Sequence, residues 1–267
     1  MEDVPDLDRP NPARMYDYFL GGGHNFGVDR DFAAQVLARS PITPHIARAN
    51  RAFLRRAVRW AVGAGYDQFL DLGSGIPTMG NVHEVARAGD PAARVAYVDN
   101  DPVAVAHAAE MLADDPRATI TRADLRDPDA VLAAPGVAGL LDLDRPVVLL
   151  LVAVLHFISE DDDPAGFVGR YRDRLAPGSA VVVSHGSADH DDPVRAAPQR
   201  VLEQLYRHTA HPVVLRDRAA LHAIAAGFTP VAPGIVDLVE WRPEGSAPVP
   251  EPTGAYGFCA VRDAPPA

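Results

Sequence analysis

The segment Asp71-Leu72-Gly73-Ser74-Gly75 places a carboxylate beside two glycines, directly after a short apolar run. Gly73 and Gly75 have no Cβ and can adopt positive φ, so a ligand can approach the main chain there. Where a buried parallel strand turns into a helix, a loop of this kind commonly binds a nucleoside or a phosphate. We therefore predict a ligand-binding loop rather than a turn that only connects two elements.

Acidic side chains follow the next two apolar segments along the chain. Asp99 and Asn100 come directly after residues 95–98, and Asp124 comes shortly after the following segment. A carboxylate in the first position can accept hydrogen bonds from both hydroxyls of a ribose. Asp124 could receive an adenine amino group. The loop and the two acidic strand ends together predict a nucleoside site.

A parallel sheet is needed to bring these residues to one edge. Apolar segments rich in β-forming residues occur at 69–72, 95–98, 118–121, 147–154 and 179–184, and helix-like segments separate them. This alternation is typical of an α/β fold with helices on both faces of a parallel sheet. The carboxyl ends of parallel strands lie at the same edge, so the three motifs should face one crevice. Further strands are predicted at 228–231, 235–241 and 256–261.

The order and spacing of these motifs resemble the class I S-adenosylmethionine-dependent methyltransferases. The matching features are the loop 71–75, Asp99, Asp124-Leu125 and the apolar fourth strand, and the likeness covers about residues 65–261. It implies a Rossmann-like, mostly parallel seven-stranded sheet with helices on both faces and a carboxyl-terminal antiparallel hairpin. Members of this superfamily often have a third glycine in the loop, whereas Ile76-Pro77 follow Gly75 here and stiffen the turn.

The amino-terminal residues carry a second resemblance. Residues 9–26 (RPNPARMYDYFLGGGHNF) and 50–54 (NRAFL) are similar to a bacterial S-adenosyl methyltransferase family long catalogued as a domain of unknown function. This resemblance implies S-adenosyl-L-methionine as cofactor and leaves the acceptor open. It also implies two parts, a helical extension at 1–64 that covers the cofactor as a lid, and a methyltransferase domain at 65–267. A packed amino-terminal arm without a lid function is the alternative.

The predicted site draws on both parts of the chain. The residues expected to bind the cofactor are Tyr18, Asn25, Arg51, Asp71, Gly73, Ser74, Gly75, Asp99, Asn100, Asp124 and Leu125. The aromatic residues of the amino-terminal helix, Tyr16, Tyr18 and Phe19, would cover the cofactor together with Asn25 and exclude water. Asn50 and Arg51 are candidates for the methionine carboxylate, because that group needs an amide or a cation and the chain contains no lysine.

His156, after the fourth apolar segment, is the candidate catalytic residue. A base or an acceptor-orienting group in this position would face the transferred methyl group. The alternative is a histidine bonded to a neighbouring backbone carbonyl. A second group of histidines and aspartates, from His185 to Asp192, matches no metal-ligand spacing, so we expect no metal there and interpret it as an acceptor-side loop.

Composition narrows the function classes. The chain has 267 residues, 48% of them hydrophobic, which fits one α/β domain with an extension. It has 25 basic and 36 acidic residues, and a net charge of −11 disfavours nucleic-acid substrates. The amino terminus lacks a signal-peptide pattern, the apolar run near residue 150 is too short to span a bilayer, and Cys259 is the only cysteine. We therefore expect a cytoplasmic protein without a membrane or nucleic-acid partner; the oligomeric state is not indicated.

Two rival functions remain at this point. A nicotinamide-dependent dehydrogenase would need Gly-x-Gly-x-x-Gly, but Thr78 stands at the third glycine position, and we expect no separate substrate domain because these 267 residues leave no length for one. A protein that binds S-adenosylmethionine without transferring methyl is the other, because no motif defines an acceptor pocket. The sequence favours a methyltransferase that acts on a small-molecule acceptor.

Overall fold

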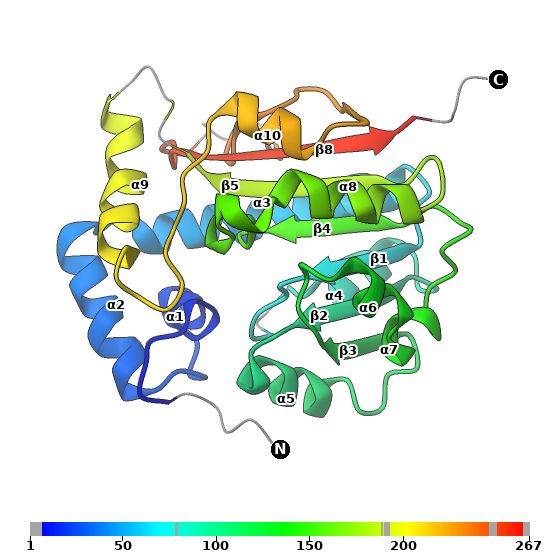
Figure 1. Ribbon diagram of the computed structural model, residues 1–267, viewed down its shortest axis with the longest axis horizontal. Helices are drawn as coiled ribbons and strands as arrows, with labels where there is room; N and C mark the ends of the chain where they lie inside the picture. Colours follow the sequence, from blue (N-terminus) through cyan, green and yellow to red (C-terminus); the bar gives the residue numbers. More distant parts are fainter. Residues whose placement is uncertain (1–6, 78–79, 188, 190–192, 246–249, 264–267) are drawn as a thin grey trace.

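One mixed sheet forms the centre of the protein. The computed structural model describes residues 7–77, 80–187, 189, 193–245 and 250–263. The sheet order is β3-β2-β1-β4-β5-β8-β6, with β7 paired to β8 (Figure 1). The strands are β1 (Gln68–Leu72), β2 (Arg94–Asp99), β3 (Ala118–Arg122), β4 (Val148–Val152), β5 (Ala180–Gly186), β6 (Phe228–Pro230), β7 (Val236–Asp237) and β8 (Ala255–Arg262). β1 to β5 pair in parallel and β8 pairs antiparallel with β5, so the predicted fold class is confirmed.

The sheet has one more strand than the predicted seven. β6 and β7 share the free edge of β8, where β6 pairs with residues 260–262 and β7 with residues 256–257. The strand predicted at 235–241 shrinks to two residues. Two carbonyls beyond β7 accept from a side chain instead of a neighbouring strand, because Arg56 donates from Nη2 to the Leu238 carbonyl and from Nε to the Trp241 carbonyl at 2.8 Å.

Ten α-helices and two short 3₁₀ turns occupy the described part of the chain. The helices are α1 (Pro12–Phe19), α2 (Gly27–Arg39), α3 (Thr43–Gly63), α4 (Val82–Gly89), α5 (Pro102–Met111), α6 (Pro128–Ala133), α7 (Pro135–Ala138), α8 (Pro164–Arg174), α9 (Pro193–Tyr206) and α10 (Arg218–Ile224); the turns are η1 (Leu155–Phe157) and η2 (Glu160–Asp162). Within the described ranges, no helix combines the length and the apolar character that a membrane crossing requires.

Local sequence explains most of these helix ends. Asp101 caps α5 through a hydrogen bond from the Val103 N–H, and Pro102 in the first turn has no N–H that would need an acceptor. The sequence did not predict α2, which begins where the buried Asp29 accepts from the Phe26 N–H at 2.9 Å. Thr43 is the first residue of α3, and its hydroxyl donates to the Ser40 carbonyl.

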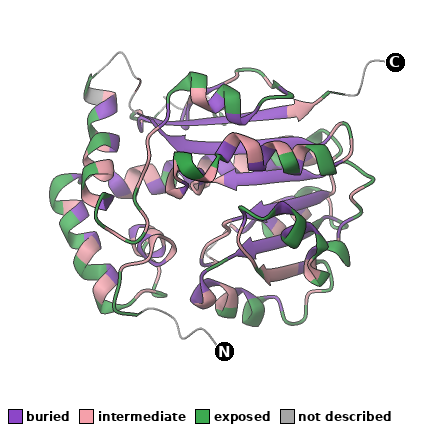
Figure 2. Cartoon of the chain, viewed as in Figure 1, coloured by how far each residue is buried: buried purple, intermediate pink, exposed green. Residues whose placement is uncertain are grey.

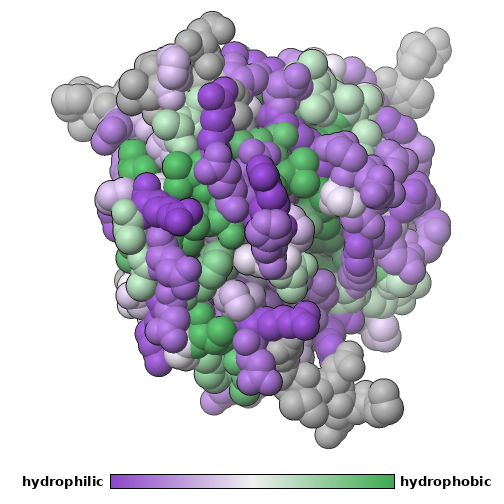
Figure 3. Space-filling view, turned by 60° about the vertical axis from the view of Figure 1, so that its left-hand side comes forward, coloured by the Kyte–Doolittle hydropathy of each residue, from purple (hydrophilic) through white to green (hydrophobic). Residues whose placement is uncertain are grey.

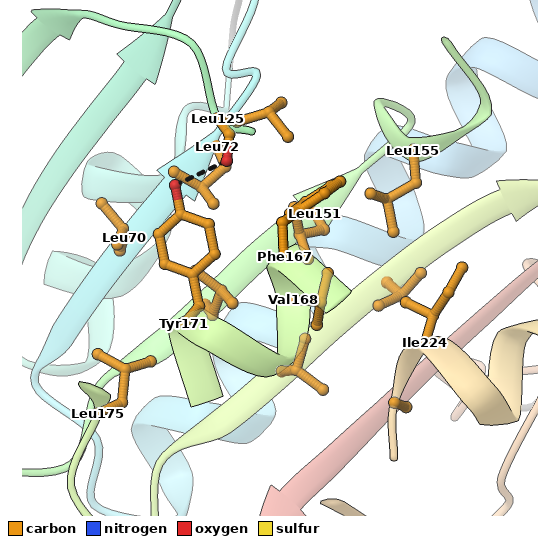
Figure 4. Packing of buried hydrophobic residues seen from close by; sticks show 14 of the residues in the cluster. Leu70, Leu72, Leu125, Leu151, Leu155, Phe167, Val168, Tyr171, Leu175 and Ile224 are labelled. Carbon is orange, nitrogen blue, oxygen red and sulfur yellow. Dashed lines mark hydrogen bonds between the residues drawn. The ribbon is translucent and has the colours of Figure 1, made fainter. Parts of the chain in front are cut away.

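Alternating side chains bury the two faces of the sheet under different helices. Leu70 and Leu72 pack on one face with Phe167 and Tyr171 of α8 and with residues of α6, α7 and α10 (Figure 4). Phe69 packs on the other face with residues of α3 and α4. β1, β2, β4, β5 and β8 are accordingly almost wholly buried, whereas the edge strands β3 and β6 are partly exposed (Figure 2). Such burial on both faces is what a central parallel sheet requires.

A third group of helices stands at the carboxyl ends of the parallel strands. α1, α2 and α9 lie beyond these strand ends, on the left of Figure 1. Their contacts form a separate apolar cluster that includes Met15, Phe19, Val36 and Tyr206. On the outer side of this group, hydrophilic side chains surround scattered hydrophobic ones (Figure 3). The amino-terminal extension is therefore packed against the edge where the sequence predicts the ligand.

Candidate active site

A cavity of about 550 Å³ lies between the strand ends and the helices α1, α3 and α9. Its volume falls within the range of sites that bind small molecules and cofactors. Nine of the predicted cofactor residues and His156 are in its wall. They are Arg51, Asp71, Gly73, Ser74, Gly75, Asp99, Asn100, Asp124 and Leu125, and only Tyr18 and Asn25 among the predicted residues are not.

The glycine loop has the backbone geometry that its sequence predicts. Gly73 and Gly75 have φ angles of 70° and 67°. A Cβ at Gly73 would lie 2.3 Å from Cγ2 of Val154, so that position also lacks space for a side chain. The N–H groups of Gly73 and Ser74 both donate to the Val98 carbonyl, at 2.8 and 3.1 Å. These bonds hold the loop against the end of β2.

Asp99 connects the loop to the second strand end. Its Oδ2 accepts from the Gly75 N–H at 2.7 Å and its Oδ1 from the Asp101 N–H at 2.9 Å. The residue is only 7% exposed. Burial raises the pKa of the Asp99 carboxyl, and the backbone donors partly offset that rise. The carboxylate is thus oriented by the backbone and faces the cavity.

Asp71 is the second buried acid of the site. Burial raises the pKa of its carboxyl to about 7, the cation of Arg51 acts in the opposite direction, and the nearby Asp99 adds to the rise. Arg51 itself donates from Nη2 to the Gly80 carbonyl at 2.9 Å. In a low-dielectric cavity, the two acids can bind a cationic group of a ligand and the guanidinium can bind an anionic one.

Asp124 has a partner that the sequence did not reveal. Arg126 donates to it from Nε at 3.0 and 3.1 Å and from Nη2 at 2.6 Å, and its Nη1 reaches Asp162 at 2.9 Å. The hydrogen bonds from Arg126 lower the pKa of the Asp124 carboxyl. Next to it, the Leu125 carbonyl accepts from the Tyr171 hydroxyl at 2.9 Å (Figure 4). Both residues line the cavity, but the Asp124 carboxylate is already hydrogen-bonded within the protein.

Tyr18 and Asn25 do not occupy the predicted positions. α1 turns Tyr16 and Phe19 toward the cavity, and Tyr18, two residues from Tyr16, lies on another side of the helix. Asn25 is bonded away from the cavity, because its Nδ2 donates to Oδ2 of Asp17 at 2.9 Å and to the Gly22 carbonyl at 3.0 Å. Tyr18 and Asn25 therefore do not line the cavity, whereas Tyr16 and Phe19, from the same predicted set of aromatic residues, do.

A buried polar chain ties α1 to the strand ends. The Ala153 N–H donates to Oγ of Ser184 at 2.8 Å, and that hydroxyl donates to Oδ1 of Asn50 at 2.6 Å. Nδ2 of Asn50 donates to the Tyr16 hydroxyl at 2.8 Å, which in turn donates to the Ala47 carbonyl at 3.1 Å. All five residues line the cavity. The predicted set of cofactor residues did not include Tyr16 or Ser184, although the sequence placed Tyr16 among the aromatic residues of the amino-terminal helix and Ser184 at a strand end.

His156 and His185 lie together in the wall beyond the loop. Their ring centroids are 5.6 Å apart. Burial and then the cation of Arg216 lower the pKa of His156 to about 4, and burial lowers that of His185 well below its usual value. Nδ1 of His156 is buried and has no hydrogen-bond partner among the described residues. His156 is thus a neutral imidazole and is not bonded to a carbonyl through that nitrogen.

The segment 185–192 is only partly described. His185 is buried at the end of β5, and Asp189 accepts from the Ser187 hydroxyl at 2.8 Å. His190, Asp191 and Asp192 lie outside the described residues, so the predicted acceptor-side loop stays a prediction.

Comparison with known proteins gives a consistent family. The S-adenosyl methyltransferase family matches residues 2–264. A solved structure from Thermobifida fusca YX, described as a methyltransferase, is 37% identical, with a TM-score of 0.89 over 99% of this chain and 100% of that one. A DUF574 family protein from Streptomyces avermitilis is 35% identical, with a TM-score of 0.89 over 96% and 99% of the two chains.

A shorter similarity links the chain to a protein that modifies RNA. Over 52 residues it is 46% identical to ribosomal RNA small subunit methyltransferase H of Halorhodospira halophila, a match that spans 20% of this chain and 16% of that protein. The full-length matches decide the assignment. The chain belongs to the S-adenosyl methyltransferase family, and it is a methyltransferase that uses S-adenosyl-L-methionine as methyl donor.

Proposed function

We propose that the protein methylates a small, largely apolar molecule inside the cavity, with the cofactor along the strand ends and the acceptor beneath α1 and α9. The observation that carries this proposal is the continuity of one cavity of about 550 Å³ from the glycine loop to the wall around His156. The wall on the helix side is mostly apolar and aromatic; it includes Phe19, Leu54, Phe157, Leu202, Tyr206 and Val213. Such a wall favours a compact acceptor that loses its water on binding.

The residues at the strand ends fit the cofactor. The oriented carboxylate of Asp99 suits a ribose diol, and the raised pKa of Asp71 shows a buried acid that a cationic ammonium would stabilise in its charged form. Arg51 and Asn50 would receive the methionine carboxylate. Asp124 and Leu125 would line the adenine end. The Asp124 carboxylate would have less capacity to accept hydrogen bonds from the adenine, because Arg126 already donates to it. Ser74 supports the same fit, because its buried hydroxyl has no partner among the described residues.

Positioning is the main task of the protein in this reaction. The bound sulfonium supplies an activated methyl group and a neutral leaving group. The cavity wall holds the acceptor in line with it and excludes water. His156 would orient the acceptor or receive its proton when the acceptor carries an O–H or N–H group.

We also propose that residues 1–64 act as a lid. α1 contributes Tyr16 and Phe19 to the cavity, and the chain Tyr16-Asn50-Ser184 connects it to β5. The extension is not separable from the rest, because Phe53, Leu54 and Ala57 of α3 pack directly on the sheet. Opening of the lid would therefore involve α1 and α2 rather than α3.

The proposal is tested by calorimetry and by methyl transfer. S-adenosylmethionine should bind the purified protein and NAD should not. A labelled methyl group should then pass to members of a panel of small phenols and heteroaromatic amines, and not to an RNA fragment added as the alternative acceptor. Cofactor binding without transfer to any panel compound would favour a binding protein, and transfer to the RNA alone would contradict a small-molecule acceptor.

A further inference from the structure

Arg216, in the connection between α9 and α10, is a buried arginine that lies outside the cavity wall. Its side chain is 2% exposed, and Nε donates to Oε1 of Glu160 at 2.8 Å. Nη1 donates to the Leu155 carbonyl and Nη2 to the Ile158 carbonyl, both at 2.8 Å. These two carbonyls flank the short turn η1 that carries His156. One planar guanidinium thus fixes both ends of the turn, as only a forked donor can.

The same guanidinium determines which ring nitrogen of His185 carries the hydrogen. Nη1 of Arg216 lies 3.0 Å from Nε2 of His185, and Nδ1 of His185 lies 2.7 Å from the Gly186 carbonyl. A guanidinium can only donate, so Nε2 must be the acceptor, and a carbonyl can only accept, so Nδ1 must carry the hydrogen. His185 is therefore a neutral imidazole with both nitrogens engaged. It has no site left for a proton from a substrate.

His156 differs from His185 in this respect. A neutral imidazole always has one unprotonated nitrogen. The backbone of His156 is held, since its carbonyl accepts from the Val214 N–H at 2.8 Å, but no described residue bonds its Nδ1. The ring lies in the cavity wall between Phe157 and His185. Of these two histidines, only His156 has free proton-accepting capacity.

We propose that Arg216 is a positioning residue for methyl transfer. It fixes the turn η1, which carries His156, and keeps the His156 imidazole neutral, so that this imidazole receives the proton of an O–H or N–H acceptor. This inference rests on the proposed function and assigns the acceptor class. As the acceptor atom gains the methyl group, the electron pair of its O–H or N–H bond stays on that atom. The proton passes to the unprotonated nitrogen of His156 and later to water.

The charges around His156 support this role. Arg216 is the cation that lowers the pKa of His156, and Glu160 accepts a hydrogen bond from Nε of the same guanidinium. The other titratable groups of this part of the wall are His185 on β5, Tyr16 on α1, and Tyr206 and His211 at the end of α9 and after it. The strand-end carboxylates already described share the cavity. Within the described chain no carboxylate is hydrogen-bonded to His156, and burial and the Arg216 cation both lower the pKa of its imidazole.

The first test uses the unaltered protein and needs no acceptor. Nitrogen-15 NMR should show His185 as the Nδ1–H tautomer, with Nε2 unprotonated throughout the range in which the protein stays folded. His156, assigned by its loss in His156→Gln, should stay neutral to about pH 5. A His185 that carries its hydrogen on Nε2, or a His156 that titrates near pH 6.5, would overturn the proposal.

The second test changes the guanidinium. Arg216→Met should raise the titration midpoint of His156 by at least one pH unit, and Arg216→Lys, which keeps the charge but not the fork, should raise it less. Arg56→Met is the matched control, because Arg56 also bonds two backbone carbonyls but lies away from His156. Cofactor affinity should change less than threefold in all three. An unchanged His156 midpoint in Arg216→Met would contradict the role.

Activity gives a third readout once the methyl-transfer panel has supplied an acceptor. In Arg216→Lys the acid limb of the kcat profile should move to higher pH, and kcat should fall at least tenfold with little change in KM for the cofactor. A fall in cofactor affinity alone would contradict a positioning role. Absence of cofactor binding in the unaltered protein would instead refute the proposed function, whatever the NMR result.

Discussion

Oδ2 of Asp99 accepts a hydrogen bond from the Gly75 N–H at 2.7 Å, although 24 residues separate the two in sequence. The bond joins the end of β2 to the loop that follows β1. A parallel sheet makes this contact possible, because the two strands are neighbours and end at the same edge. The acidic residue and the glycine loop therefore form one structural unit in the wall of the cavity.

The first prediction concerns the acid of that unit. Asp99→Ala should lower the affinity for S-adenosylmethionine at least tenfold, because it removes charge-assisted hydrogen bonds worth roughly 1.5–3 kcal/mol. Isothermal calorimetry measures the effect. Asp129→Ala, at an exposed position on α6, serves as control and should bind normally. Unchanged affinity in Asp99→Ala would remove that residue from the site.

The second prediction separates backbone conformation from steric space in the glycine loop. Gly73→Ala should destabilise the protein by roughly 2–4 kcal/mol, because it combines a positive φ with a Cβ that meets Val154. Gly65 also has a positive φ but open space around it, so Gly65→Ala should cost less, roughly 1–2 kcal/mol. Urea unfolding compares the two. Adding Val154→Ala to Gly73→Ala should restore part of the loss; equal costs at both glycines would argue against the close contact.

The third prediction links cofactor binding to pH through Asp71. The pKa of its carboxyl is about 7 in the ligand-free protein, and a cationic ligand favours the carboxylate. Binding at pH 6 must therefore release a proton, and affinity should rise between pH 6 and pH 8. Calorimetry in buffers of different ionisation enthalpy measures that proton. In Asp71→Asn the pH dependence should disappear; a dependence that survives would assign it to another group.

The fourth prediction concerns acid stability. The pKa of His156 is about 4 in the folded protein, that of His185 is also lowered, and an unfolded histidine titrates near 6.5. The unfolded state then binds more protons below pH 6.5, so the free energy of unfolding should fall as the pH drops from about 6.5 toward 4. His156→Phe should reduce that slope, whereas the exposed His222→Gln should not. Urea unfolding at pH 7 and pH 5 provides the comparison.

The fifth prediction distinguishes the two tyrosines of α1. Tyr16→Phe removes the hydroxyl between Asn50 and the Ala47 carbonyl, and should cost about 1 kcal/mol of stability and weaken cofactor binding. Tyr18→Phe should leave cofactor affinity unchanged, since Tyr18 is not in the cavity wall. The same calorimetric titration tests both. The reverse result would show that the sequence-based choice of Tyr18 was right.

Residues fixed by short-range rules could be predicted from the sequence. The glycine loop, Asp99 and the strand order follow from apolar runs, positive-φ glycines and the geometry of parallel strands. The side of α1 that meets the cavity could not be predicted, because a short helix with Tyr16 and Phe19 on one side and Tyr18 on another shows its partner only in the tertiary structure. The length of β7 was overestimated for a similar reason. Arg56, about 180 residues away in sequence, binds the Leu238 and Trp241 carbonyls, which would otherwise be available to extend the strand.

Long-range side-chain pairs were the second limit. Arg216 and His185 come from separate connections, and no local pattern marks their contact. The pairing of Arg126 with Asp124 is local, only two residues apart, and could have been recognised as a competitor for the adenine end. The position of Asp99 is set by strand order, whereas that of the buried Arg216 guanidinium is set by how loops pack. The strand-end part of the cavity was therefore more predictable than the wall around His156 and His185.

A crystal structure with S-adenosylhomocysteine, the product of the donor, tests the central claim most directly. The ribose hydroxyls should lie within hydrogen-bond distance of Asp99, the amino acid part should lie beside Asp71 and the glycine loop, and the sulfur should face the wall that contains His156. A ligand bound outside the cavity, or inside it with its ribose away from Asp99, would contradict the account.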